Sequence, residues 1–259
     1  MRSFFYRFFI ELTNHRLSSY IIKSFAQSKL SKWIVPSFAK VYNINQEEMH
    51  GELSSFPTLQ QLFIRTLKPG ARKIDEASNT IVSPVDAVVE KSGSITENLE
   101  MIVKGKHYSI KDMLSDESIA TKYMGGTYVI LYLSPSHYHR IHSPIAGRVT
   151  SQWTLGKKSY PVNRLGLLYG KDPLSKNFRK ITELESDGKH IAVVKVGAMF
   201  VNSIEMTHKG EVLQKGEDMA YFSFGSTVIL LFEKDTVELN ETLKEKADVK
   251  VGEVIASWK

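Results

Sequence analysis

Because the chain contains no cysteine, few side chains could act as a nucleophile. One candidate is Ser226, in the stretch YFSFGSTVILLFEK of residues 221–234. The apolar run after Ser226 predicts a buried strand, and Gly225 at its start weakens a strand unless the backbone bends or lies close to another group. A bulge or turn would also explain this glycine. Since Gly225 has no Cβ, its carbonyl is open to attack by the neighbouring hydroxyl.

Three histidines form the second candidate group. The segment SPSHYHRIHSP contains His137, His139 and His142. His137 and His139 share one face of an extended segment, and this spacing is used by metal ligands and by general bases. A hydrogen-bonded cluster without a catalytic role is the third interpretation. A zinc-dependent hydrolase with His137 and His139 as ligands is therefore one hypothesis.

Asp86, in SPVDAVV, completes a candidate catalytic set. Asp86 and His142 both flank a Ser-Pro turn, so they would approach each other if the two turns packed together. In a triad the aspartate orients the imidazole, and the imidazole removes the proton of the serine hydroxyl. The stretch SFGSTVI lacks the G-x-S-x-G pattern of a hydrolase serine. The residues therefore favour a serine that cuts its own chain, between Gly225 and Ser226.

These residues need a scaffold, and the sequence predicts a β-rich one. After Ile81 the segments are short, rich in β-branched residues and separated by Gly, Pro, Asn or Asp, with TYVILYL and KHIAVVKVGAMFV as the clearest strands. VSPVDAVVEKSG resembles HSPIAGRVTSQW, and LQKGEDMAYF resembles DVKVGEVIASW, which indicates an internal duplication. Lipoyl and biotinyl carrier domains have similar patterns, but no modifiable lysine stands out at a hairpin tip.

We therefore expect an α+β fold, in which a β-rich duplicated sandwich, similar to a barrel-sandwich, follows N-terminal amphipathic helices. Residues 58–67 and the segment SIKDMLSD predict short helices, with a turn at Pro69 and Gly70 between them. Residues 156–180 predict a long irregular excursion. Loops of that length within a compact domain are usually functional.

The charge is concentrated at the N-terminus. Residues 1–45 hold seven Lys or Arg against one acidic residue, Glu11, which accounts for the whole net charge of +6. The remaining 27 basic and 27 acidic residues balance. A nucleic-acid-binding protein would more often spread a basic face over its folded body, so this asymmetry points to an anionic membrane surface and not to nucleic acid.

The same segment is amphipathic. Apolar residues recur at helical spacing on one face, at Phe4, Phe5, Phe8, Phe9 and Leu12 and again at Ile21, Ile22, Phe25, Leu30, Trp33, Ile34 and Phe38. No window is long and apolar enough for a spanning helix. We predict that residues 1–45 lie on a membrane and that residues 46–259 form the catalytic domain. Packing of these faces on the domain is the alternative.

Seven motifs, in order, resemble the phosphatidylserine decarboxylases over nearly the whole chain. They are LFIRTLKPGARKI, SPVDAVV, VKGKHYSIKDML, YHRIHSP, YPVN, VGAMFVNSI and FGSTVILLFEK. Three positions depart from the family pattern: Ala87 and Ala220 replace usual glycines, and Phe224 replaces a common leucine. These changes affect local geometry more than identity.

The resemblance implies a pyruvoyl-dependent carboxy-lyase made as a self-cleaving proenzyme. Ser226 would attack the carbonyl of Gly225, divide the precursor into chains 1–225 and 226–259, and become the pyruvoyl cofactor. That group would form a Schiff base with phosphatidylserine and release CO2 to give phosphatidylethanolamine. Asp86, His142 and Ser226 would form the self-cleavage triad, with His142 as base, and His139 would act in decarboxylation.

The resemblance also implies a peripheral location on the cytoplasmic side of the cell membrane. No metal is expected, and we expect a homo-oligomer. Two other classes remain as hypotheses: the zinc hydrolase, which would leave Ser226 uncut, and a non-catalytic membrane adaptor, which would not need the Gly225–Ser226 junction.

Overall fold

The structure is a computed structural model, and it describes residues 16–158, 160–198, 204–223 and 226–259. Gly225 and the apolar residues predicted between Phe4 and Leu12 lie outside the described residues. The described helical elements are α2 (Arg16–Gln27), η1 (Lys29–Ile34), α3 (Val35–Val41), η2 (Leu53–Ser55), α4 (Leu59–Phe63), α5 (Ile110–Leu114), α6 (Glu117–Lys122), α7 (Arg164–Tyr169) and α8 (Pro173–Lys176).

Most of the fold is strand, as predicted. The strands are β1 (Thr80–Val82), β2 (Ala87–Ser94), β3 (Glu100–Val103), β4 (Lys106–Ser109), β5 (Thr127–Leu133), β6 (Arg140–His142), β7 (Gly147–Leu155), β8 (Arg179–Ser186), β9 (Lys189–Gly197), β10 (Ile204–Met206), β11 (Val212–Leu213), β12 (Asp218–Phe222), β13 (Ser226–Phe232), β14 (Val237–Leu239), β15 (Asp248–Val249) and β16 (Val254–Trp258). The expected α+β class is confirmed.

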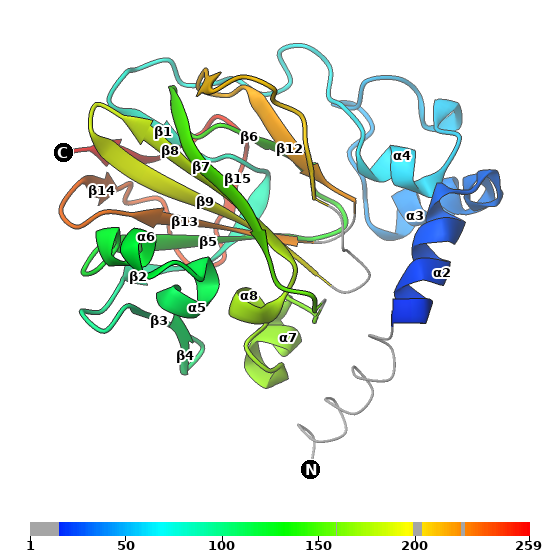
Figure 1. Cartoon of the computed structure of the whole chain (residues 1–259). Helices are drawn as coiled ribbons and strands as arrows, with labels where there is room; N and C mark the ends of the chain where they lie inside the picture. Colours follow the sequence, from blue (N-terminus) through cyan, green and yellow to red (C-terminus); the bar gives the residue numbers. More distant parts are fainter. Residues whose placement is uncertain (1–15, 159, 199–203, 224–225) are drawn as a thin grey trace.

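One large antiparallel sheet organises the body (Figure 1). Its order is β11-β7-β8-β9-β13-β5-β2-β15, so β13 lies near the middle with β9 and β5 as neighbours. Two three-stranded sheets, β1-β16-β14 and β10-β12-β6, and the hairpin β3-β4 complete the strands. Within the described residues no sheet closes into a barrel.

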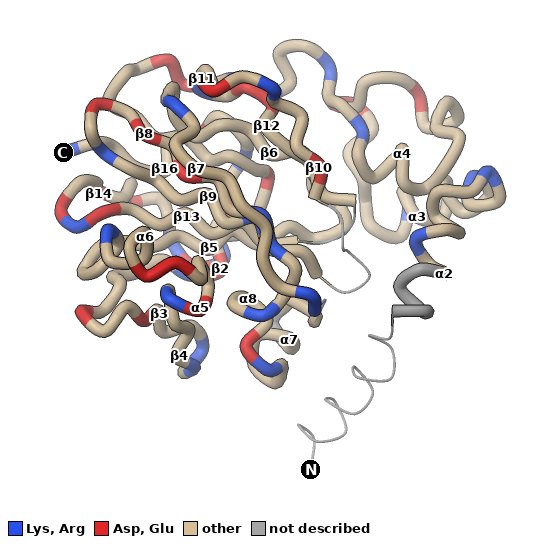
Figure 2. The backbone as a smooth tube through the Cα atoms, in the orientation of Figure 1, with Lys and Arg blue, Asp and Glu red and all other residues tan. Residues whose placement is uncertain are grey.

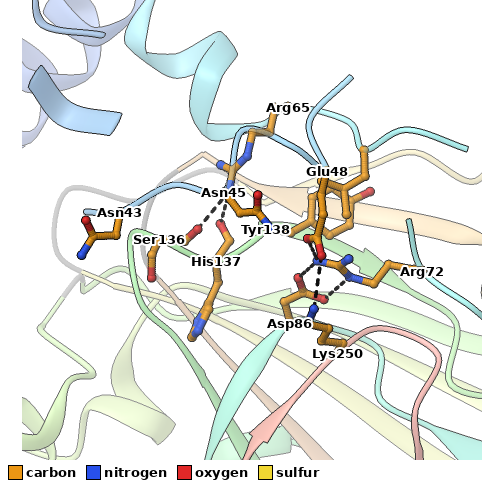
Figure 3. Close-up of a pocket in the computed structure, with 11 residues that line it drawn as sticks. Asn43, Asn45, Glu48, Arg65, Arg72, Asp86, Ser136, His137, Tyr138 and Lys250 are labelled. Carbon is orange, nitrogen blue, oxygen red and sulfur yellow. Dashed lines mark hydrogen bonds and ion pairs between the residues drawn. The ribbon is translucent and has the colours of Figure 1, made fainter. Parts of the chain in front are cut away.

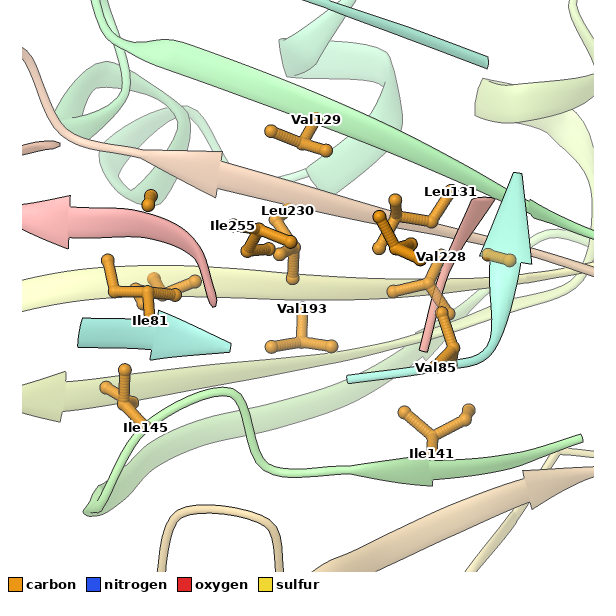
Figure 4. Packing of buried hydrophobic residues seen from close by; sticks show 14 of the residues in the cluster. Ile81, Val85, Val129, Leu131, Ile141, Ile145, Val193, Val228, Leu230 and Ile255 are labelled. Atoms are coloured by element: carbon orange, nitrogen blue, oxygen red, sulfur yellow. The ribbon is translucent and has the colours of Figure 1, made fainter. Parts of the chain in front are cut away.

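Strand β13 is buried along its whole length because both faces of the large sheet are covered. Val228, Leu230 and Phe232 face one core cluster, which joins the large sheet to the two small sheets (Figure 4). Ile229 and Leu231 alternate into a second cluster, which includes residues of the β3-β4 hairpin and of α5 to α8. This two-sided burial explains why β13 reads as a continuous apolar run.

The predicted duplication is visible in the backbone hydrogen bonds. The two Ser-Pro turns bond reciprocally: Val82 N–H donates to the Pro144 carbonyl at 3.0 Å, and His142 N–H donates to the Pro84 carbonyl at 2.8 Å. The two Ser-Pro turns therefore pack against each other.

The Lys-Gly-Glu and Val-Gly-Glu hairpins hold these turns in matching ways. Gly216 N–H donates to the Ser143 carbonyl at 2.8 Å, and Gly252 N–H donates to the Ser83 carbonyl at 3.1 Å. Both glycines adopt positive φ, at 78° and 90°. A Cβ on either glycine would lie 2.7 Å from an Ile74 side-chain carbon. Only glycine combines this conformation with this close approach.

The N-terminal helices pack onto the residues that follow them. An apolar cluster joins Ala26, Val35 and Ala39 to Leu59 and Leu62. Ser31 links the same parts, because its hydroxyl accepts a 2.9 Å hydrogen bond from Leu59 N–H. The helix expected over 58–67 is shorter in the structure: α4 starts after the N-cap Thr58 and ends at Phe63. The domain boundary at residue 45 stays a prediction.

Candidate active site

Ser226 is the first residue of β13, in the middle of the large sheet. It pairs with Leu133 of β5 on one side and with Gly197 of β9 on the other. Its side chain is fully buried, and its Oγ has no hydrogen-bond partner among the described residues. A buried hydroxyl without a partner is uncommon and is frequently associated with function.

A cavity of about 110 Å³ lies beside Ser226. Besides Ser226, its lining consists of Tyr132, Pro135, Pro161, Val162, Asn163 and Ala198. Two of the sequence motifs, YPVN and VGAMFVNSI, therefore contribute residues next to the serine. The excursion predicted over residues 156–180, which contains α7 and α8 in the structure, contributes Pro161, Val162 and Asn163 to this lining.

Asn177 fixes this excursion to the sheet, and the sequence reasoning missed it. Asn177 is fully buried, and its Nδ2 donates to the carbonyls of Tyr160 at 2.7 Å and Gly197 at 2.8 Å. Its Oδ1 accepts from Tyr160 N–H at 2.9 Å. Asn177 thus joins the YPVN segment to the residue that pairs with Ser226. The only sequence signal was a polar residue at the end of the excursion.

The histidine segment begins next to Ser226. Leu133 pairs with Ser226, and the His139 carbonyl accepts a 3.0 Å hydrogen bond from Phe222 N–H. Leu133, just before the histidine segment, and His139 within it are therefore hydrogen-bonded to β13 and β12. The tertiary structure brings the histidines and the serine, far apart in sequence, into one region.

His139 has a fixed tautomer and a free base nitrogen. Its Nδ1 lies 2.9 Å from the His137 carbonyl, which can only accept, so Nδ1 carries the proton. Its Nε2 is buried without a partner among the described residues, and its ring packs on Phe63 with centroids 3.9 Å apart. Burial, with the nearby charge of Arg65, holds the pKa of His139 well below its usual value. His139 is a neutral buried base.

His142 is also held with its proton on Nδ1. Nδ1 donates to the Gly216 carbonyl at 2.8 Å, and Nε2 lies 3.1 Å from the Tyr138 hydroxyl. Burial lowers the pKa of His142, although the Gly216 carbonyl and the charges of Asp218 and Asp86 act in the opposite direction. At neutral pH its Nε2 lone pair therefore accepts from Tyr138.

His137 takes the opposite tautomer, because its Nδ1 accepts a 3.0 Å hydrogen bond from Ser134 N–H. The described residues contain no group of three His, Asp or Glu side chains that could hold a metal ion. The pairing of His137 with His139 as zinc ligands is therefore not supported by the described residues.

Asp86 is bound to Arg72, as Figure 3 shows. No hydrogen bond joins Asp86 to His142 among the described residues. Asp86 Oδ1 accepts from Arg72 Nε at 2.9 Å and from Val251 N–H at 2.9 Å, and Oδ2 accepts from Arg72 Nη2. Arg72 also pairs with Glu48 at 2.8 Å. Asp86 therefore makes no direct hydrogen bond to His142 in the described part of the chain, and the effect of its charge is to raise the pKa of that histidine.

A second cavity, of about 220 Å³, lies on the Asp86 side of the histidine segment. The residues that line it include His137, Tyr138, Arg65 and Lys250 (Figure 3). Arg65 supports the histidine segment by donating from Nη2 to the carbonyls of Ser136 at 3.0 Å and His137 at 3.1 Å. The structure thus gathers Asp86, His139, His142 and Ser226 around one segment, but not as a hydrogen-bonded triad.

Comparison with known proteins identifies the family. The sequence profile of phosphatidylserine decarboxylase matches residues 59–257. A phosphatidylserine decarboxylase proenzyme from a Geobacillus species is 62% identical over 259 residues, which cover 100% of both chains. The proenzyme of Anoxybacillus flavithermus is 60% identical, over 98% of this chain and 96% of its own. That of Bacillus cereus is 58% identical, over 99% of this chain and 98% of its own. The chain therefore belongs to the phosphatidylserine decarboxylase family.

Proposed function

We propose that the chain is a proenzyme that cleaves itself between Gly225 and Ser226 and then decarboxylates phosphatidylserine to phosphatidylethanolamine. Family membership supports the decarboxylase activity. The observation that carries the proposed site is the buried Ser226 hydroxyl, which has no partner among the described residues and lies beside a cavity.

In the proposed cleavage, Ser226 Oγ bonds to the Gly225 carbonyl carbon as the Gly225–Ser226 peptide bond breaks, which leaves an ester and a free amine on residue 226. Nε2 of His142 takes the hydroxyl proton, and Asp86 stabilises the resulting positive charge. Loss of the Cα proton of residue 226 expels the ester oxygen with the upstream chain, which ends in a Gly225 carboxylate. The dehydroalanine left behind takes up one water and releases ammonia.

The residues present fit the pyruvoyl group made in this way. Ser226 ends up at the N-terminus of the central strand, next to a cavity lined mainly by apolar groups and by Asn163. When formed, the pyruvoyl group supplies a ketone that binds the substrate amine and accepts the electrons left as CO2 departs. We propose that His139 holds or moves a proton at its free Nε2, and that the buried surroundings exclude water.

The processing and the cofactor can be tested by mass spectrometry. The purified protein should contain a 34-residue chain, residues 226–259, whose mass shows a pyruvoyl group in place of serine. Phosphatidylserine and a hydride reductant together should add the substrate to this chain and stop turnover. A 34-residue chain with an intact serine, or substrate attached only to residues 1–225, would contradict the proposal.

We further propose a peripheral location on the cytoplasmic side of the cell membrane, through the N-terminal helices. No helix in the described part of the chain is long and apolar enough to cross a bilayer. Many of the exposed large apolar side chains belong to α2, η1 and α3, or to Tyr42, which follows α3. We call this set of side chains the N-terminal apolar surface. They are Ile21, Ile22, Phe25, Leu30, Trp33, Ile34, Val41 and Tyr42. Lys29, Lys32 and Lys40 lie in the same segment and suit an anionic bilayer.

Replacing Leu30 and Trp33 together by serine should weaken binding to anionic vesicles by about 100-fold or more, because each side chain contributes roughly 1.5–3 kcal/mol when buried. Leu30 and Trp33 are 69% and 86% exposed, so the fold should tolerate the change. Deleting residues 1–45 is a poorer test, since it also removes Ala26, Val35 and Ala39 from the apolar cluster.

The measurement is co-sedimentation with vesicles at several salt concentrations. Binding of the unchanged protein should weaken with salt but persist, because salt screens the lysines and not the apolar contact. Val212→Ser, at an exposed position on β11, is the matched control. Equal binding of the Leu30/Trp33 variant and the control would place the membrane contact elsewhere.

A further inference from the structure

Helix α7 exposes two leucines next to the candidate active site. Leu165 is 52% exposed and Leu168 is 40% exposed, whereas Leu167 of the same helix is buried in the core. Helix α7 thus divides its apolar residues between the protein interior and the surface. About half of each of these two side chains is exposed, and neighbouring apolar side chains on a surface mark a candidate interaction site.

Helix α7 is attached directly to the wall of the Ser226 cavity. Its N-cap, Asn163, lines that cavity, and Asn163 Oδ1 accepts from Gly166 N–H at 2.9 Å. A Cβ on Gly166 would lie 1.9 Å from the Pro161 carbonyl oxygen, so the helix packs on the cavity wall as closely as only glycine allows. At the other end, Lys106 Nζ donates to the Gly170 carbonyl at 2.6 Å. The two leucines therefore have a fixed position relative to Ser226.

The surroundings of α7 are basic. Residues 156–180 contain seven Lys or Arg against a single acid, Asp172, although residues 46–259 as a whole are neutral. Four of the cations, Lys157, Lys158, Lys171 and Lys176, are exposed. Figure 2 shows this concentration of basic positions around α7 and α8. Exposed leucines among lysines are the composition of a surface that binds an anionic bilayer.

The small size of the Ser226 cavity is a second argument for a membrane-binding surface near α7. At about 110 Å³ the Ser226 cavity is well below the 300–1,000 Å³ of common ligand pockets, so it has room for a headgroup but not for two acyl chains. The acyl chains of a phospholipid whose headgroup reaches residue 226 must stay in the membrane. The mouth of the cavity must then lie at the membrane surface.

We propose that α7 is a second membrane-contact element, in which Leu165 and Leu168 enter an anionic phospholipid bilayer and the four exposed lysines bind its headgroups. This inference rests on the proposed function, because it assigns α7 to delivery of the lipid substrate. It is independent of the N-terminal apolar surface, which lies on η1, α2 and α3. Figure 1 shows α7 on the lower side of the molecule, toward which the N-terminal end of α2 also points.

A single-cysteine label reports whether position 168 enters the bilayer. Since the chain has no cysteine, Leu168→Cys in the full-length protein gives one site for an environment-sensitive dye. Val212→Cys, at a 59% exposed position on β11, is the matched control. With vesicles that contain phosphatidylserine, the emission at position 168 should shift to shorter wavelength and that at position 212 should not.

Three outcomes would overturn the inference. The first is no shift at position 168 although the protein sediments with the vesicles. The second is the same shift at position 212. The third is a shift at position 168 that rises with protein concentration in the absence of vesicles, which would mean that the leucines contact a second copy. None of these outcomes depends on self-cleavage, so failure of the inference can be distinguished from failure of the proposed function.

Activity gives an independent measurement. Replacing Leu165 and Leu168 together by serine should lower decarboxylation of phosphatidylserine in vesicles at least fivefold more than decarboxylation of a soluble short-chain phosphatidylserine. Val212→Ser should lower neither. A denaturing gel of the same preparations shows whether the precursor was cleaved. An equal loss on both substrates with complete cleavage would contradict a membrane role for α7.

Discussion

Ser226→Ala protein should remain a single chain of 259 residues and should release no CO2 from phosphatidylserine. The change removes the hydroxyl that is proposed to attack the Gly225 carbonyl and form the ester, and with it the precursor of the ketone. We expect loss of both processing and activity to the detection limit. A denaturing gel and an assay of CO2 release measure the two effects on the same sample.

Thr227→Val is the matched control for this experiment. Thr227 is the next residue of β13, its hydroxyl is also buried without a partner among the described residues, and adjacent strand residues point to opposite faces. The Thr227 variant should therefore still be cleaved after Gly225. A cleaved and active Ser226→Ala protein, or an unchanged protein that is active as an uncut chain, would contradict the proposed origin of the cofactor.

His142→Ala and His139→Ala should separate cleavage from turnover. Without the base nitrogen of His142, cleavage should slow by about 10²–10⁴-fold, the usual contribution of a general base. His139→Ala should be cleaved at least in part and should lose decarboxylation. A gel for cleavage and an assay for CO2 release, with both variants prepared in parallel, provide the measurement.

The structure also allows the opposite assignment, in which His139 is the base for cleavage and His142 acts in decarboxylation. Nε2 of His139 has no partner in the described part of the chain, whereas Nε2 of His142 is bonded to Tyr138. An uncut His139→Ala protein beside a fully cut His142→Ala protein would reverse the two roles.

Asp86→Ala should also slow cleavage, by about 10²-fold. The Gly216 carbonyl still holds the His142 tautomer in that variant, but the charge that stabilises the imidazolium is lost.

The pH dependence of cleavage tests the same assignment. Burial lowers the pKa of His142 below that of an ordinary histidine. Since the base acts when deprotonated, the decline of the cleavage rate on acidification should have its midpoint at a lower pH than the value of about 6.5 expected for an ordinary histidine.

Local patterns in the sequence were sufficient to predict the main strands and turns of this fold. The continuous apolar runs of β5, β9 and β13 are properties of neighbouring residues. β5 forms where it was predicted, and β9 covers the described part of its predicted strand up to Gly197. The two Ser-Pro turns and the two glycine hairpins could be matched as repeats because turn geometry restricts residue type. The position of Ser226 at the start of a buried strand also followed from the sequence, as did the family resemblance.

The partners of the site residues were decided by the tertiary structure. Asp86 was expected to orient His142. Instead, Asp86 accepts hydrogen bonds from Arg72, and His142 Nδ1 donates to the carbonyl of Gly216, 74 residues away. The position of Lys195 was not predictable either, because a lysine in a strand suggests an exposed edge. Lys195 is instead fully buried, with its Nζ 2.7 Å from Thr182 Oγ1, and burial lowers its pKa to about 7.

The physical reason is that a hydrogen bond requires two groups within about 3 Å, and for residues far apart in sequence that distance depends on strand register and on which sheets pack together. Periodicity shows that a strand has a buried face, but it does not identify the group across the interface. The sequence therefore determined which residues could do chemistry, their order along the chain and the strand that carries Ser226. Only the packing of the two repeat copies, and of residues 156–180 over the large sheet, decided which atoms meet.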